Sequence, residues 1–162
     1  MYYFHNIHFQ KYYLNSNEKN YIEWYYQSYP SVKEYMAKNV DFARKNGYVS
    51  TILNRKRYIK EINSSNFNLR SFGERAAMNM PLQGSSADII KIAMVNVYNR
   101  LKKENLKAKL ILQVHDELII DCPIEEVEIA KNILVEEMQN AVNLKVPLLV
   151  EANVGKTWFE AK

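Results

Sequence analysis

Three adjacent ionisable residues, His115, Asp116 and Glu117, interrupt the apolar stretch LILQVHDELIID. The two carboxylates offer the oxygen ligands that hard cations such as magnesium prefer. In two-metal phosphoryl transfer, ions about 3.5–4 Å apart hold the attacking and leaving oxygens, and carboxylates hold the ions. Adjacent acids supply only part of such a site, because both ions need ligands from more than one direction. A polar turn, in which Asp116 caps backbone amides, is the alternative interpretation of the same residues.

A second group of polar residues lies upstream in FGERAAMNMPLQGSSADIIKIAM. If this segment is helical, Arg75 and Asn79 are four residues apart and share a face, and Gln83 follows after Pro81. Arginine suits a phosphate, while asparagine and glutamine can hydrogen-bond base edges, sugars or backbone. Periodicity alone is equally consistent with a core helix that has one polar side. The small residues from Gly84 onward, GSSA, permit close packing of another element.

Length and composition indicate a globular chain without a membrane span. The chain has 162 residues, of which 48% are hydrophobic and 25% are charged, so we expect one domain with a loosely attached N-terminal segment. Its apolar runs are shorter than the roughly 20 residues that a bilayer requires, and its start lacks a signal-peptide pattern. The single cysteine, Cys122, is expected to be a small core or edge residue. We therefore predict a cytoplasmic location and no membrane partner.

The charges are distributed unequally along the chain. Residues 1–75 hold 12 Lys and Arg against 6 Asp and Glu, whereas residues 76–162 hold 10 against 12. A basic half is typical of a surface that binds a polyanion such as nucleic acid. Solvated Lys and Arg on helix faces are the alternative explanation.

Two helices are predicted before the first hairpin. Residues 17–29 have a helical pattern that Pro30 ends. Ser31 and Glu34 have the spacing of a capping box, so a second helix is expected over residues 32–45. Gly47 then provides a left-handed C-cap.

The rest of the chain predicts a mixed fold of the α+β class, an antiparallel sheet covered on one face by helices. The charged trio lies at the tip of the second hairpin. The expected elements are strands over 48–53 and 56–59, helices over 66–80 and 83–104 separated at Pro81, strands over 108–114 and 118–122, a helix over 125–142 and a strand over 146–154.

Residues 1–24 are predicted to be an N-terminal segment of uncertain structure. Their aromatic-rich start has no clean period. His5 and His8 are three residues apart, but no nearby Cys or carboxylate completes a metal site.

The two polar stretches together resemble one known family. ERAAMNMPLQGSSADIIKIAM followed by LQVHDELIIDCP is similar to the C-terminal palm region of family A DNA polymerases, the bacterial DNA polymerase I type. The resemblance runs over residues 25–162 and includes GYVSTILNRKRYIKEINSSNFNLRSFGERAAMN and VPLLVEANVGKTWFEAK. It follows the family's order and spacing, and neither motif alone would be as specific.

The resemblance implies roles for particular residues. Asp116 would be the catalytic carboxylate that binds metal, in a two-ion Mg²⁺ site that this chain supplies only in part. Glu117 would be an auxiliary catalytic acid. The positions that match DNA-binding positions of the family, including the basic turn at Asn54-Arg55-Lys56-Arg57, are Arg55, Arg57, Arg75, Asn79, Gln83, Gln113 and His115.

Two family elements are not found before Tyr25. One is the strand motif with the other catalytic aspartate, usually a run like DYSQIELR, and the other is the fingers helix that holds the incoming nucleotide. Asp88 lies in a helical run and Asp121 at a strand end, so neither replaces that aspartate.

These features define the predicted function. The resemblance implies a DNA-directed DNA polymerase that performs template-directed nucleotidyl transfer in replication and repair, here as a C-terminal fragment that is inactive alone. The implied partners are primer-template duplex DNA, deoxynucleoside triphosphates in the full-length family, and the upstream polymerase segment. A non-catalytic duplex-binding module is one alternative. A metal-dependent phosphohydrolase that uses His115 and Asp116 is another, although it would need more metal ligands.

Overall fold

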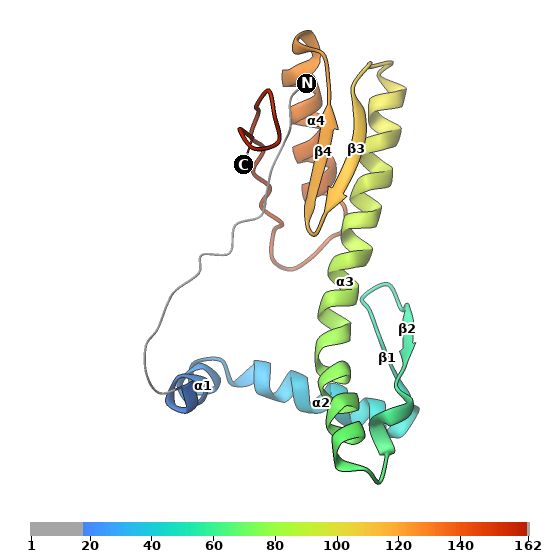
Figure 1. Ribbon diagram of the computed structural model, residues 1–162, viewed down its shortest axis with the longest axis vertical. Coiled ribbons are helices and arrows are strands. Elements are labelled where there is room, and N and C mark those ends of the chain that lie inside the picture. Colours follow the sequence, from blue (N-terminus) through green and yellow to red (C-terminus); the bar gives the residue numbers. More distant parts are fainter. Residues whose placement is uncertain (1–17, 162) are drawn as a thin grey trace. The chain divides into compact units, whose positions relative to one another are not determined.

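The computed structural model describes residues 18–161, which form two compact units (Figure 1). The N-terminal unit contains the described residues up to Ser85 and the C-terminal unit those from Ser86 onward, so the boundary falls inside one helix. Among the described residues, no helix is long and apolar enough to cross a membrane. The elements, in chain order, are α1 (Glu18–Ser28), α2 (Pro30–Asn46), β1 (Tyr48–Ser50), β2 (Lys56–Tyr58), the 3-10 turn η1 (Lys60–Asn63), α3 (Phe67–Lys103), β3 (Lys109–Val114), β4 (Glu117–Asp121), the 3-10 turn η2 (Ile124–Glu126) and α4 (Val127–Gln139).

The ends of α2 follow from two residues with restricted or unusual backbone angles. Pro30 occupies the first turn and Tyr29 is the N-cap, which makes no side-chain capping bond. The predicted cap at Ser31 is therefore wrong, because the fixed φ of proline already suits the first helical position. At the other end, Gly47 has φ 78° and its N–H donates to the Ala43 carbonyl at 2.7 Å, which confirms the predicted left-handed cap.

The β1–β2 hairpin packs with α2 and α3 in the N-terminal unit. Its strands are antiparallel, with Tyr48 paired to Tyr58 and Ser50 to Lys56, so both are shorter than predicted. The loop between them spans residues 51–55. The buried core of this unit comprises Val40, Ala43, Val49, Ile59, Ile62, Ala77 and Met80.

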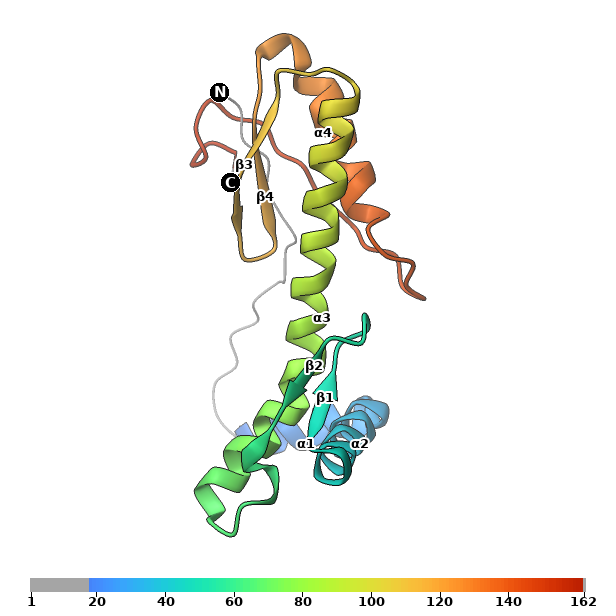
Figure 2. The same ribbon diagram turned by 90° about the vertical axis from the view of Figure 1, so that its right-hand side faces the viewer.

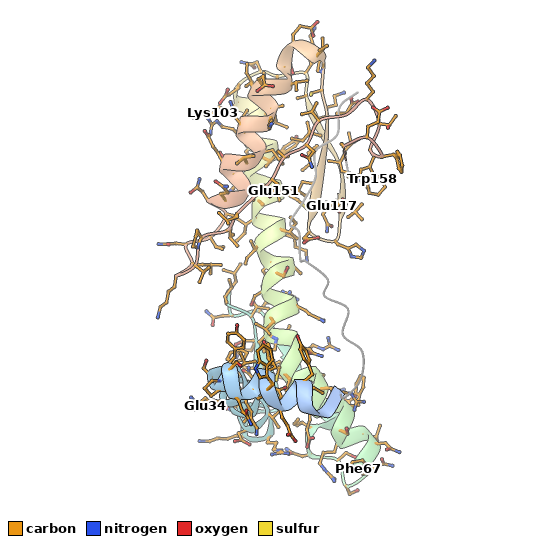
Figure 3. All side chains as sticks on the ribbon, turned by 90° about the vertical axis from the view of Figure 1, so that its left-hand side faces the viewer. Glu34, Phe67, Lys103, Glu117, Glu151 and Trp158 are labelled. Carbon is orange, nitrogen blue, oxygen red and sulfur yellow. The ribbon has the colours of Figure 1, made fainter. Side chains whose placement is uncertain are left out.

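A single helix replaces the two that were predicted on either side of Pro81. α3 runs unbroken for 37 residues, and Figure 3 labels Phe67 and Lys103 at its ends. Proline in a helix interior removes one backbone hydrogen bond and costs about 3 kcal/mol. Burial of Pro81, and of Ala77 and Met80 beside it, offsets that cost. Tertiary packing therefore outweighs the local signal.

In the C-terminal unit, helices cover one face of the β3–β4 hairpin. The strands are antiparallel and Ile111 has no partner between Leu110 and Leu112, which makes a β-bulge. Figures 1 and 2 both show this hairpin beside α4 and the C-terminal part of α3. The core residues are Ala93, Val97 and Leu101 of α3, Ala108, Leu118, Ile120 and Cys122 of the hairpin and its flanks, and Val127, Ala130, Ile133, Leu134 and Met138 of α4. The α+β class is confirmed, with small antiparallel sheets.

The end of the chain departs from the predicted pattern. The helix expected over 125–142 begins as η2 and continues as α4 to Gln139. The strand expected over 146–154 is not formed, so that prediction is wrong. Two apolar residues of this segment, Val150 and Ala152, nevertheless pack against the core of the C-terminal unit. A strand needs a partner to satisfy its backbone groups, and none pairs with this segment among the described residues.

We predict that Ile120→Ala lowers the free energy of unfolding by about 2–5 kcal/mol, because it deletes a buried side chain and leaves a cavity. Urea denaturation followed by circular dichroism measures this. Ile111→Ala is the matched control, since Ile111 is 47% exposed on the neighbouring strand and should change stability by no more than about 0.5 kcal/mol. Equal losses for the two variants would contradict the described core.

We also predict that Cys122 is unreactive in the native chain at neutral pH. Burial raises the pKa of the Cys122 thiol, and the carboxylates of Asp121 and Glu126 raise it further. Because the thiolate is the reactive form, alkylation by iodoacetamide should be far slower than in the urea-denatured chain. Equal alkylation rates in the two states would contradict this burial.

Candidate nucleic-acid interface and carboxylate hairpin

The turn of the β3–β4 hairpin presents the predicted catalytic residues. His115 and Asp116 form the two-residue turn, and Glu117 pairs with Val114 as the first residue of β4. His115 has φ 51°, a left-handed conformation that histidine adopts more readily than most residues. The side-chain amide of Gln113 donates to the His115 carbonyl, which ties the turn to β3.

The side chains of this turn differ in exposure. His115 is exposed, whereas Asp116 and Glu117 are half-buried. Successive strand residues point to opposite faces. Leu118 belongs to the helix-facing core, so Glu117 points to the other face of the hairpin. Figure 3 labels Glu117 at the turn end of the hairpin. The hairpin thus carries carboxylates on two consecutive residues, at and beside its turn.

These carboxylates fit a magnesium ion in part. Aspartate and glutamate oxygens have the right chemistry for a hard cation. Within the described part of the chain, however, no group of three or more His, Cys, Asp or Glu side chains is arranged so that it could hold a metal ion. Asp116 and Glu117 alone would be a partial donor set, and a two-ion site would take further ligands from outside the described residues.

In the N-terminal unit, four predicted DNA-binding residues line one hollow. Arg75, Asn79 and Gln83 are exposed at four-residue spacing along α3, so they form a polar stripe on one face. Arg57 reaches the same hollow from β2, which lies beside α3 (Figure 2). The hollow has a volume of about 280 Å³, and its lining residues are Arg57, Phe72, Arg75, Ala76, Asn79, Met80 and Gln83.

The chemistry of the hollow combines cations, amides and apolar surface. Arg75 is oriented by donating from Nη1 to the Ser71 hydroxyl at 2.8 Å. Guanidinium groups bind phosphates, whereas amides accept and donate at base edges and sugars without demanding one sequence. Phe72 and the buried Met80 add apolar surface to the lining of the hollow. This arrangement suits a nucleic-acid backbone and the groove beside it.

Arg55 is placed differently from the other predicted DNA-binding residues. It does not line the hollow, and its Nη2 donates to the Gly84 carbonyl of α3 at 3.1 Å. Gln113 and His115 lie in the C-terminal unit, at the β3–β4 hairpin. The structure therefore brings four of the seven predicted DNA-binding residues together.

The sequence reasoning did not single out Phe72 and Met80 in the lining of the hollow, or Ser71 beside it. Ser71 lies four residues before Arg75, so the same helical spacing that linked Arg75 to Asn79 could have found it. Lys56, which belongs to the predicted basic turn, does not line the hollow, and its Nζ lies 4.4 Å from the centre of the Tyr48 ring. This contact joins β1 and β2, and the local sequence does not predict it.

Comparison with known proteins shows which family the chain belongs to. The family model for DNA polymerase family A matches residues 10–160. The chain belongs to DNA polymerase family A. It is 58% identical over 142 residues to DNA polymerase I of Caldicellulosiruptor bescii, covering 88% of this chain and 17% of that protein. It is 54% identical over 152 residues to DNA polymerase I of Bacillus caldotenax, covering 92% of this chain and 17% of that protein.

A solved polymerase domain shares the fold. The POL domain of Pol1 from M. smegmatis, in complex with DNA primer-template and dNTP, matches with a TM-score of 0.86 and 44% sequence identity. The match covers 88% of this chain and 25% of that one. The chain spans about a sixth of the length of the curated family A relatives it matches.

Proposed function

We propose that this chain takes part in template-directed DNA synthesis as the C-terminal part of a family A palm, over residues 25–162. It would hold primer-template duplex in the hollow of the N-terminal unit and contribute Asp116 to a magnesium site. Family membership supports polymerase activity at the level of the family. The similar Pol1 domain, solved with DNA primer-template and dNTP, supports duplex DNA and deoxynucleoside triphosphates as partners of the complete enzyme. Roles in replication and repair, and a cytoplasmic location, are further parts of this proposal.

One observation carries the proposal. Arg57 of β2 and the α3 stripe of Arg75, Asn79 and Gln83 line a single hollow. The two arginines can neutralise phosphates on a strand, and the amides of Asn79 and Gln83 can reach the adjacent groove. A polymerase must grip duplexes of any sequence, and this mixture provides affinity without base selection.

The hairpin has a different task. Asp116 would hold metal, with Glu117 as an auxiliary acid, while His115 and Gln113 would lie near the primer terminus. Bound magnesium would neutralise charge on the phosphates and align the reacting oxygens. The contribution of the chain's own residues is to present two carboxylates at a turn that the Gln113 bond to the His115 carbonyl ties to β3. The remaining ligands would come from the upstream polymerase segment.

A second candidate, a duplex-binding module without chemistry, fits the same residues. The hollow is complete within the N-terminal unit, whereas the carboxylate pair is only a partial donor set among the described residues. We therefore propose that the chain by itself binds duplex DNA and does not extend primers. Addition of the upstream segment would convert binding into synthesis.

We predict that Arg75→Ala weakens duplex binding by similar factors for unrelated sequences. Loss of one phosphate contact should reduce the slope of log affinity against log salt by about 0.9. Fluorescence anisotropy at several salt concentrations measures both effects. Arg44→Ala is a control with the same change of charge, because Arg44 contacts Glu74 at 2.8 Å and Asp41 at 3.4 Å outside the hollow. An unchanged slope for Arg75→Ala would remove Arg75 from the interface.

We predict that the purified chain with magnesium and all four nucleotides gives no primer extension. Asp116→Asn should bind duplex as tightly as the unmodified chain, because Asp116 lies on the hairpin and outside the hollow. Extension that disappears in Asp116→Asn would overturn the proposed inactivity and identify a self-sufficient polymerase. Release of phosphate without a template would instead favour a phosphohydrolase.

A further inference from the structure

The loop between β1 and β2 is hydrogen-bonded to α3 just beyond Pro81. The backbone N–H of Ile52 donates to the Ser85 hydroxyl at 3.0 Å, and that hydroxyl donates to the Pro81 carbonyl. Arg55 Nη2 donates to the Gly84 carbonyl at 3.1 Å. Ser85 is buried, so its hydroxyl is shielded from water. Two points of the loop are thus fixed to two consecutive residues of the helix.

The loop is also braced internally. The Thr51 hydroxyl accepts from the Arg55 N–H at 3.2 Å, and the Thr51 N–H donates to the Arg55 carbonyl at 3.1 Å. Asn54 closes the turn with φ 61° and an N–H bond to the Thr51 carbonyl at 2.9 Å. Because these bonds join the two ends of the loop, a displacement of Thr51 moves Arg55 with it.

Gly84 allows the loop to come this close to α3. A Cβ at position 84 would lie 2.8 Å from Thr51 Cγ2 and 3.1 Å from Met80 Cε. The end of a methionine side chain can move aside. Thr51 cannot do so easily, because it is 4% exposed, has a stiff β-branched side chain and uses its hydroxyl to hold Arg55.

We propose that Gly84 and Ser85 form a seat for this loop, and that the seat positions Arg57 for duplex binding. Arg57 follows Arg55 by two residues, so the position of the loop determines where β2 places the guanidinium of Arg57. In the hollow, Arg57 meets the α3 stripe that begins at Arg75. Arg55 is then a positioning residue, which holds the loop on the helix rather than binding phosphate. This inference rests on the proposed binding of duplex DNA.

The test is Gly84→Ala in the full chain, measured by anisotropy with a labelled primer-template duplex at several salt concentrations. If the added methyl displaces Arg57, the salt slope should fall by about 0.9, which is about an eightfold loss of affinity near 0.1 M salt. Thr51→Ser removes Cγ2 but keeps the hydroxyl. It should leave binding unchanged by itself and restore binding in the Gly84→Ala background. Ser85→Ala should weaken binding in the same direction as Gly84→Ala.

A double-mutant cycle with Arg57→Ala separates positioning from general damage. If the seat acts through Arg57, Gly84→Ala should cost nothing further once Arg57 is alanine. Equal losses in both backgrounds, or no rescue by Thr51→Ser, would overturn the inference. Circular dichroism reports whether each variant is folded.

The same measurements distinguish a failure of the proposed duplex binding from a failure of the proposed seat. If the unmodified chain shows no salt-dependent duplex binding, the proposed function fails and the seat loses its role. If the unmodified chain binds and Arg57→Ala weakens it, but Gly84→Ala changes neither affinity nor slope, only the seat is wrong.

Discussion

The continuity of α3 through Pro81 is the constraint on which the candidate interface depends. Arg75 and Asn79 precede the proline, whereas Gln83 and the seat residues follow it. If the helix ended at Pro81, Gln83 would leave the polar stripe and the loop would lose its contact surface. Proline costs a helix about 3 kcal/mol, so this continuity has to be stabilised by tertiary contacts. Burial of Ala77 and Met80 in the N-terminal core provides them, and the hydroxyl of Ser85 adds a second bond to the Pro81 carbonyl.

The two candidate sites differ in what each requires from the fold. A groove for a polyanion needs side chains from two neighbouring elements, and α3 and β2 of one unit supply them. A two-ion site needs carboxylates that converge from several directions. In the proposed site, Asp116 and Glu117 of the hairpin would supply one such direction. This difference is the reason why we propose duplex binding for the chain itself and synthesis only for the chain together with further polymerase segments.

Features set by local sequence were predicted well. The left-handed cap at Gly47 and the two hairpins depend on residues that are adjacent in sequence, and both were found. The GSSA run was recognised as a place for close packing, and Gly84 does lie against Thr51. The identity of that neighbour could not be predicted, because Thr51 and Gly84 are 33 residues apart.

The wrong predictions concern features that depend on tertiary contacts and not on the local sequence. Pro81 is a helix breaker in isolation, and only the surrounding core makes it tolerable. The strand expected over 146–154 has apolar alternation but no pairing partner among the described residues, and sequence pattern cannot supply one. Arg55 and Arg57 look equivalent in a basic turn, yet Arg55 bonds to the α3 backbone while Arg57 lines the hollow.

The most direct test of the interface is to modify arginines with phenylglyoxal and map the products by mass spectrometry, with and without duplex DNA. If the hollow binds duplex, DNA should protect Arg57 and Arg75 while Arg44, which lies outside the hollow, reacts to the same extent in both samples. Unchanged modification of Arg57 and Arg75 under conditions where the chain is fully bound to duplex would contradict the account. The duplex would then occupy another surface.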